Sequence, residues 1–281
     1  MAEKSLRQAL RAPLAPVCLA DLDPRATVLA PGNKATTPAT MQADGAKVAS
    51  LQEALYAEGT GGSNRRVLLV LQGMDTSGKG GVIKHVIGAV NPQGIQIVSF
   101  KRPTSAELAH HFLWRIRRAV PPPGLIGIFD RSHYEDVLIG RVRRLVPART
   151  WEKRYAEINR FERGLVEDGV QIIKCFLHIS FEAQRERLLA RLDDPEKRWK
   201  FNPADVDERQ RWPAYTKAYE AVLDQTNTES APWYVVPSDR KWYRNWAIGR
   251  LLLETLTEMD PQFPKPAYDV DEQRRRLTED D

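Results

Sequence analysis

Short apolar runs alternate with longer segments of helical period along most of the chain. Five runs rich in Val, Ile, Leu and Phe predict buried strands at 66–71, 95–100, 125–129, 170–179 and 233–236. Between them apolar residues return at spacings of three and four, as from Trp151 to Leu165, which predicts helices near 79–90, 105–119, 151–165, 181–192, 207–224 and 240–258. This alternation predicts an α/β fold, a three-layer sandwich whose five-stranded parallel sheet has helices on both faces.

The two ends of the chain lack this alternation. Residues 1–45 are rich in Ala and Pro without a sustained period, so we expect an extended N-terminal arm there. A short amphipathic stretch at 47–58 leads into the folded part, which we place at residues 46–260, and residues 261–281 are expected to form a C-terminal tail. Parallel sheets of this kind bind ligands beyond the carboxyl ends of their strands, so the chemistry should follow the strands.

The composition is that of an ordinary globular protein. The chain has 281 residues, 42% of them hydrophobic and 28% charged, which excludes disordered and fibrous classes. Its two cysteines form neither a disulfide framework nor a metal-binding spacing, which favours a reducing cytoplasm. No apolar run approaches the roughly 20 residues of a membrane span. The N-terminus also lacks the apolar region of a signal peptide, so we expect neither membrane insertion nor export.

The charge balance points to an anionic partner. The chain carries 42 Lys and Arg against 37 Asp and Glu, a net charge of +5, and its pI is about 9.2. A basic surface attracts any polyanion nearby. Nucleotides, nucleic acids and inorganic phosphate chains therefore all remain candidates at this stage.

A phosphate-binding loop directly follows the first predicted strand. Residues 73–81 read G-M-D-T-S-G-K-G-G, which satisfies the G-x-x-x-x-G-K core and opens a predicted helix. Glycines let the backbone turn so that its N–H groups point inward, the helix N-terminus adds partial positive charge, and the lysine reaches terminal phosphates. A Gly-rich strand-to-helix turn is the alternative, but strand, spacing, lysine and helix coincide here. The candidate residues are Gly73, Gly78, Lys79, Gly80 and Gly81.

The loop departs from the usual motif at one position. Gly80 stands where a Ser or Thr hydroxyl would bind Mg²⁺. Asp75 lies inside the loop and could supply an oxygen ligand instead, with Thr76 and Ser77 as alternatives. We therefore expect Asp75 to act as a metal-ligand or general-base carboxylate.

An acid and a base follow the third predicted strand, beside the phosphate loop. Asp130 could hold Mg²⁺ directly or through water, and Arg131 could neutralise charge on a transferring phosphoryl group. The alternative is that Asp130 caps the following helix and pairs with Arg131. Arg102 follows the second strand in the same way and could clamp a phosphate.

A charged segment follows the fourth predicted strand. Arg185, Arg187 and Arg191 precede the sequence D-D-P-E-K-R-W-K at 193–200, and Arg187 and Arg191 share one helix face. In a phosphate-loop protein this position favours a mobile lid, at about 185–210, that brings arginines over phosphates and excludes water. A solvated charged helix end is the alternative.

Taken together, four ordered motifs resemble the polyphosphate kinase 2 family. They are G-M-D-T-S-G-K-G-G, F-K-R-P-T, F-D-R-S-H-Y-E-D-V-L and R-L-D-D-P-E-K-R-W-K-F, and the resemblance spans roughly Lys47 to Met259. It implies a P-loop kinase fold with the catalytic domain at 46–260 and a helical lid. It also implies phosphorylation of nucleotides by inorganic polyphosphate with Mg²⁺, for which Mn²⁺ is the alternative.

The resemblance also implies roles for individual residues. Asp75 and Lys79 would belong to the Walker A loop, Asp130 and Arg131 to Walker B, and Arg191 to the lid, with Asp75 and Asp130 as metal ligands. We further expect three residues, Arg102, Tyr134 and Glu135, to seat the nucleotide. Three basic residues, Lys84, Lys101 and Arg198, are candidates for polyphosphate binding.

The expected reaction converts ADP to ATP, and AMP to ADP, reversibly and without a covalent intermediate. The segment His133–Asp136 is similar to the group that accepts both nucleotides. We expect adenine nucleotides, with guanine as an alternative base, and a homo-oligomer that in this family is often a tetramer. An ATP-dependent nucleoside or nucleoside monophosphate kinase is the first rival. No arginine-rich tail supports a nucleic-acid-binding module, and no N-K-x-D segment supports a GTPase.

Overall fold

A five-stranded parallel sheet forms the centre of the computed structural model, which describes residues 5–88 and 90–279. The strand order within these residues is β2-β3-β1-β4-β5. The strands are β1 (Arg66–Gln72), β2 (Ile95–Ser99), β3 (Ile126–Asp130), β4 (Val170–His178) and β5 (Trp233–Pro237). Each predicted strand is confirmed to within one residue at either end. The expectation of a buried strand is wrong for β2, which lies at the sheet edge and is only partly buried. The apolar runs of the other four strands are nearly unbroken because both faces of the sheet are covered there.

The register of the central strands brings the candidate motifs to one edge. Leu71 near the end of β1 pairs with Asp130 at the end of β3, and Asp130 in turn pairs with Ser99 of β2. The segments that follow these three strands therefore emerge side by side. The phosphate loop after β1, the Asp130 segment after β3 and the basic segment after β2 meet there, as the sequence predicts for strands of one parallel sheet.

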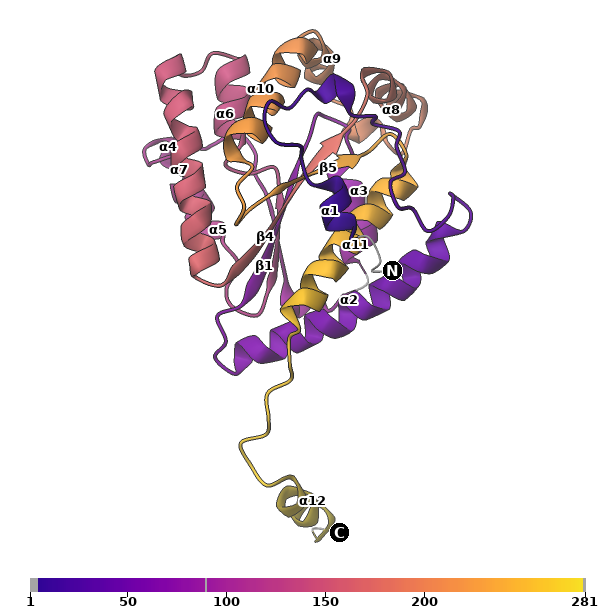
Figure 1. Cartoon of the computed structure of the whole chain (residues 1–281), viewed down its shortest axis with the longest axis vertical. Helices are drawn as coiled ribbons and strands as arrows, with labels where there is room; N and C mark the ends of the chain where they lie inside the picture. Colours follow the sequence, from indigo (N-terminus) through magenta and orange to yellow (C-terminus); the bar gives the residue numbers. More distant parts are fainter. Residues whose placement is uncertain (1–4, 89, 280–281) are drawn as a thin grey trace.

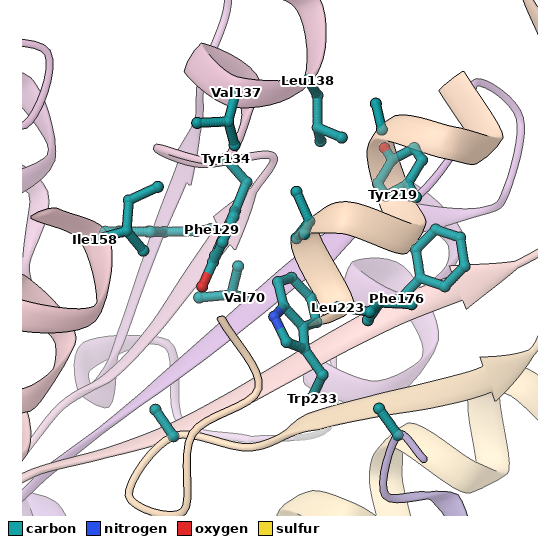
Figure 2. Close-up of a cluster of buried hydrophobic side chains, with 14 of the residues drawn as sticks. Val70, Phe129, Tyr134, Val137, Leu138, Ile158, Phe176, Tyr219, Leu223 and Trp233 are labelled. Carbon is teal, nitrogen blue, oxygen red and sulfur yellow. The ribbon is translucent and has the colours of Figure 1, made fainter. Parts of the chain in front are cut away.

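Helices cover the two faces of the sheet, and each face has its own apolar core (Figure 1). On one face lie α5 (Trp114–Ala119), α6 (Glu135–Val142), α7 (Ala148–Glu167) and α10 (Trp212–Thr226). The other face carries α1 (Leu6–Leu10), α2 (Thr37–Thr60), α3 (Lys79–Val82) and α11 (Lys241–Met259). Figure 2 shows the first core, where Tyr134 and Trp233 pack between the sheet and α10.

Several predicted helices are divided in the structure. The helix expected over 79–90 begins as α3 and continues as a π-helical turn, Ile83–Ile87, while residue 89 lies outside the described residues. The segment 105–119 forms α4 (Ser105–Leu108) and α5, and 207–224 falls into α9 (Ala204–Arg209) and α10. The helix expected at 181–192 is confirmed as α8 (Phe181–Asp193), and short 3-10 turns stand at Leu19–Asp21, Pro92–Gly94 and Arg198–Lys200.

The N-terminal segment is not an extended arm in the described residues. It forms α1, and α2 begins at Thr37, so the boundary expected at residue 45 falls inside a helix. Pro38 sits in the first turn of α2, where a missing N–H does no harm, so proline here starts a helix instead of breaking one. The backbone N–H of Ala12 donates to the carbonyl of Trp233 at 2.8 Å, which attaches the segment to the edge strand β5. Residues 1–4 lie outside the described part.

The C-terminal segment leaves the sheet domain after α11. Residues 270–279 form α12 (Val270–Glu279), which has no buried residues and stands away from the sheet in Figure 1. The segment 261–281, which we expect to be a tail, includes α12, and its residues 280 and 281 lie outside the described part. Within the described residues, each helix is too short or too polar to traverse a lipid bilayer.

Candidate active site

The phosphate loop runs from the end of β1 to the start of α3. Gly78 has a φ of 110°, in the left-handed region where a side chain is strained. A Cβ atom at this position would lie 1.8 Å from Nη1 of Arg244, so the loop also needs glycine there for space. Thr76 has a φ of 62°, which is unusual for a β-branched residue and is found where the surroundings hold the backbone in place.

Lys79 is buried at the first position of α3. Its Nζ donates to the carbonyl oxygens of Gly73, at 2.9 Å, and Met74, at 3.4 Å. Burial lowers the pKa of Lys79 because the charged form loses its hydration, and the positive charge of Arg131 acts in the same direction. The carboxylates of Asp75, Asp130 and Glu135 act in the opposite direction, and a phosphate oxygen would add further negative charge next to this ammonium group.

A cleft of about 800 Å³ lies over the loop. Ten of the predicted site residues line it: Asp75, Gly78, Lys79, Gly80, Gly81, Lys84, Lys101, Asp130, Arg131 and Arg191. The segment expected as a lid closes one side of the cleft with Arg191, Trp199 and Lys200. Tertiary structure thus brings together residues from four motifs that are far apart in the sequence.

Asp75 and Arg131 form an ion pair in this cleft. Nη2 of Arg131 donates to Oδ1 of Asp75 at 2.7 Å. Burial alone would lower the pKa of Arg131, but the carboxylates of Glu135 and Asp75 raise it above its usual value. Arg131 is therefore a permanent positive charge beside the loop, and its guanidinium group faces the same space as Lys79.

The carboxylates of the cleft fit a hard divalent metal ion held together with substrate. Asp75, Asp130 and Asp205 all line it, and burial together with the charge of Asp75 raises the pKa of Asp205. No group of three ligating side chains forms a closed metal cage among the described residues. Mg²⁺ in phosphoryl-transfer sites is usually bound by one or two carboxylates while phosphates and water complete the shell, so the donor set matches that mode.

A smaller cavity of about 50 Å³ opens on the other side of Asp75 and Arg131. Glu135 lies in it, and burial raises the pKa of this carboxyl while Arg131 opposes the rise. Three aromatic residues of α10, Trp212, Tyr215 and Tyr219, form the opposite wall. This cavity therefore joins the charged centre to an aromatic surface.

A basic cleft of about 300 Å³ adjoins the loop and shares Arg191 and Lys200 with the main cleft. Its charged lining among the described residues is cationic, with no carboxylate: Arg187, Arg191, Lys197, Lys200, Lys241 and Arg244. Burial and the neighbouring charge of Arg187 lower the pKa of Arg244 to about 9. Arg191 pairs with Asp205 at 3.6 Å and Lys197 pairs with Asp194, but neither carboxylate lines this cleft. The excess of cations in the lining favours a strongly anionic ligand.

Three predicted site residues lie elsewhere. The prediction for Tyr134 is wrong, because its side chain is fully buried and its hydroxyl donates to Glu162 Oε1 at 2.7 Å inside the core (Figure 2). A tyrosine next to a charged motif gave no signal that it points inward. Arg102 is exposed and does not line these cavities, and Arg198 instead donates through Nε to the carbonyl of Leu192 at 2.8 Å.

Sequence reasoning missed several residues of the site. Lys200, Asn202 and Asp205 line the main cleft from the lid segment, where the charged run was the available signal. Lys241 and Arg244 come from α11, a helix in which the apolar period alone was visible. Nothing local marks these two residues, because only folding places them beside the loop.

The sheet order, the phosphate loop after β1, and an acidic segment at the adjoining strand end define a P-loop kinase. The family model of polyphosphate kinase 2 matches residues 33–264. The chain belongs to the polyphosphate kinase 2 family, which confirms the expectation from its motifs.

Individual relatives agree with this assignment. The chain is 48% identical to the AMP/ADP-polyphosphate phosphotransferase of Meiothermus ruber over 87% of its own length and 90% of the relative's. It is 45% identical to the ADP-polyphosphate phosphotransferase of Rhodopseudomonas palustris over 78% of each chain. The crystal structure of polyphosphate kinase 2 from Arthrobacter aurescens is similar with a TM-score of 0.95 and 47% identity, covering 98% of this chain and 97% of the other.

Proposed function

We propose that the protein transfers a phosphoryl group from inorganic polyphosphate to ADP, giving ATP, and to AMP, giving ADP. The observation that carries the proposal is the pair of cavities that meet at Asp75 and Arg131. The main cleft shares Arg191 and Lys200 with the basic cleft of six cations, and the smaller cavity holds two further carboxylates and three aromatic rings. The relatives named as polyphosphate phosphotransferases support the same donor and the same acceptors.

The donor chain would occupy the main and basic clefts. A linear polyanion needs successive positive charges along its path, and Lys84, Lys101 and Lys200 continue the row of cations from the basic cleft across the loop. An ATP-binding kinase would also need room for a base and ribose at this end. The purely cationic lining of the basic cleft favours a phosphate chain instead.

The acceptor nucleotide would approach from the smaller cavity. Its terminal phosphate would reach Arg131 and its base would lie against Trp212 and Tyr215. A volume of about 50 Å³ is too small for a nucleoside, so α9 and α10 would move outward as the acceptor binds. Glu208, which accepts from Tyr215 and from Nη2 of Arg143 at 2.7 Å, holds this wall in its present place.

The chemistry of the site is positioning together with charge neutralisation. Mg²⁺, or Mn²⁺, would be held by Asp75 and Asp130 and would supply positive charge to the phosphates of both substrates. Lys79 and Arg131 face the same space and would stabilise negative charge on the transferring group. Arg191 would complete the cationic ring from the lid and would help to exclude water.

The experiment supplies purified protein with Mg²⁺, long-chain polyphosphate and either ADP or AMP, and follows the products by chromatography. We expect ATP from ADP, and ADP from AMP, only when polyphosphate is present. A parallel reaction with ATP plus AMP and no polyphosphate tests the rival nucleotide kinase. Transfer from ATP but not from polyphosphate would disprove the proposed donor, while the fold and the family would stand.

Assembly and location belong to the same proposal. We propose a cytoplasmic homotetramer, for which the family resemblance and the two unpaired cysteines are the support. Light scattering at several protein concentrations tests the assembly, and a monomer at all of them would disprove it.

A further inference from the structure

Two arginines from distant parts of the chain, the half-buried Arg187 and the buried Arg244, meet at the phosphate loop. Arg187 of α8 donates through Nη1 to the carbonyl oxygens of Thr76, at 2.8 Å, and Ser77, at 3.0 Å. Arg244 of α11 donates through its own Nη1 to the carbonyl of Ser77 at 3.1 Å. The Ser77 carbonyl is thus shared by two guanidinium groups.

These contacts fall on the part of the loop with the least favourable backbone. Thr76 and Gly78, on either side of Ser77, both have a positive φ, of 62° and 110°. The C=O and N–H of one trans peptide unit point in opposite directions. Because the carbonyl of Ser77 faces the arginines, the N–H of Gly78 faces the other way. The hydrogen bonds from the two arginines therefore stabilise this conformation of the loop, because a backbone with unfavourable φ values needs contacts from its surroundings to persist.

Arg244 is packed into this position and is not a surface charge. Its side chain is 3% exposed, and Asn245 Oδ1 accepts from its Nη2 at 2.8 Å. A Cβ atom on Gly81 would lie 2.8 Å from the same Nη2, so the first turn of α3 is in direct contact with the guanidinium group. Arg187 is fixed from its other side by the carbonyl of Asp239 at 3.0 Å.

Both arginines also line the basic cleft. We propose that Arg187 and Arg244 are positioning residues that hold the phosphate loop in its phosphate-binding conformation and couple that conformation to the polyphosphate side of the site. The inference rests on the proposed function for the identity of the donor. It assigns to α11, at the far end of the chain, a role in the geometry of a loop that follows the first strand.

The proposal predicts a selective kinetic defect in Arg244→Gln. The KM for polyphosphate rises about tenfold and kcat falls about 10- to 100-fold, because a misplaced loop moves Lys79 away from the transferring group. The KM for ADP stays within about twofold of wild type, because Arg244 does not line the cavity proposed for the acceptor. Arg244→Lys separates the effect of charge from that of geometry. In this variant we expect the KM for polyphosphate to return close to the wild-type value, because the positive charge is kept. We expect kcat to stay low, because an ammonium group lacks the planar, forked hydrogen-bonding geometry of a guanidinium group.

A second measurement does not depend on activity. Hydrogen exchange of a peptide covering residues 72–82 is followed in the protein without substrate, and Arg244→Gln is expected to speed exchange of the loop amides at least about tenfold. Arg66→Gln is the matched control. Arg66 is also a buried arginine bonded to carbonyl oxygens, at the opposite end of β1, and its loss should lower thermal stability without changing loop exchange or either KM.

Each outcome decides the proposal. Unchanged loop exchange in Arg244→Gln, or equal increases of both KM values, would overturn it, as would full recovery of kcat in Arg244→Lys. If Arg244→Gln does not fold, Arg244→Lys carries the test alone, and loop exchange at the wild-type rate would overturn the inference. A wild-type protein without polyphosphate-dependent transfer would disprove the proposed function, whereas the exchange experiment would still decide whether the arginines position the loop.

Discussion

A buried network of charged side chains in the core around Tyr134 allows a quantitative prediction of how a substitution changes the free energy of unfolding. Nζ of Lys174, on β4, donates to Oε2 of Glu162 at 2.7 Å, to the hydroxyl of Tyr134 at 3.0 Å and to the carbonyl of Thr226 at 2.7 Å. The other carboxylate oxygen of Glu162 lies 3.1 Å from Nε2 of His133. Both Lys174 and Glu162 are almost completely buried, so no solvent can replace a lost partner.

Replacing Lys174 by Met removes the ammonium group at nearly constant volume. Glu162 would then be a buried carboxylate without its charged partner, a situation that costs about 3–5 kcal/mol in folding free energy. This is a large fraction of the roughly 5–15 kcal/mol that stabilises a typical protein. The second change Glu162→Gln removes the stranded charge, so we expect the double variant to recover about 1–3 kcal/mol of the loss.

Urea unfolding followed by tryptophan fluorescence measures these differences, at one protein concentration because the proposed subunit association would contribute to stability. The measurements form a double-mutant cycle of four proteins: wild type, Lys174→Met, Glu162→Gln and the double variant. A loss of less than about 1 kcal/mol in Lys174→Met at an unchanged m-value would refute the reasoning. A double variant no more stable than Lys174→Met would refute it as well, because the penalty would then not come from the unpaired carboxylate.

Three further predictions concern single side chains. Lys79→Ala and Asp75→Ala should each lower phosphotransfer at least about 100-fold with an unchanged circular dichroism spectrum, and full activity in either folded variant would contradict the site. Ellman's reagent should label the exposed Cys18 in the native protein, and Cys175 only after unfolding, because burial raises the pKa of the Cys175 thiol. Burial opposes ionisation of Glu162, but Lys174 holds its pKa below the usual 4.5, so its contribution to stability is complete above that pH and is lost as the pH falls through the folded-state pKa. The stability difference between wild type and Glu162→Gln should therefore shrink below about pH 4.5, and a constant difference would contradict the assignment.

The features that the sequence predicts correctly are those written in neighbouring residues. The strands are confirmed because each one is rich in apolar residues, and four of them are largely buried, as strands covered on both faces of a parallel sheet are. The edge strand β2 is only partly buried. The phosphate loop is recognisable because its glycines and Lys79 lie within nine residues. The expected meeting of this loop with Asp130 follows from the polarity of parallel strands, which bring their carboxyl ends to one edge.

The errors have physical causes as well. Proline-rich sequence predicts an extended segment, but Pro38 stands in the first turn of a 24-residue helix, where proline is favourable. The charged motif before Tyr134 predicts a contact with the nucleotide, yet the ring of Tyr134 lies in the core because Glu162 and Lys174 provide buried partners for its hydroxyl. Both errors come from judging a residue without the elements that pack against it.

The strands, the phosphate loop, the acidic segment after β3 and the family can all be predicted from the sequence. Which distant side chains support that loop, and which cations share one cleft, depends on the packing of the helices and the sheet. Arg187 and Arg244 reach Ser77 from 110 and 167 residues away. Periodicity and motifs report on contacts within a strand or a helix turn, whereas these arginines act through contacts that exist only after the helices have packed onto the sheet.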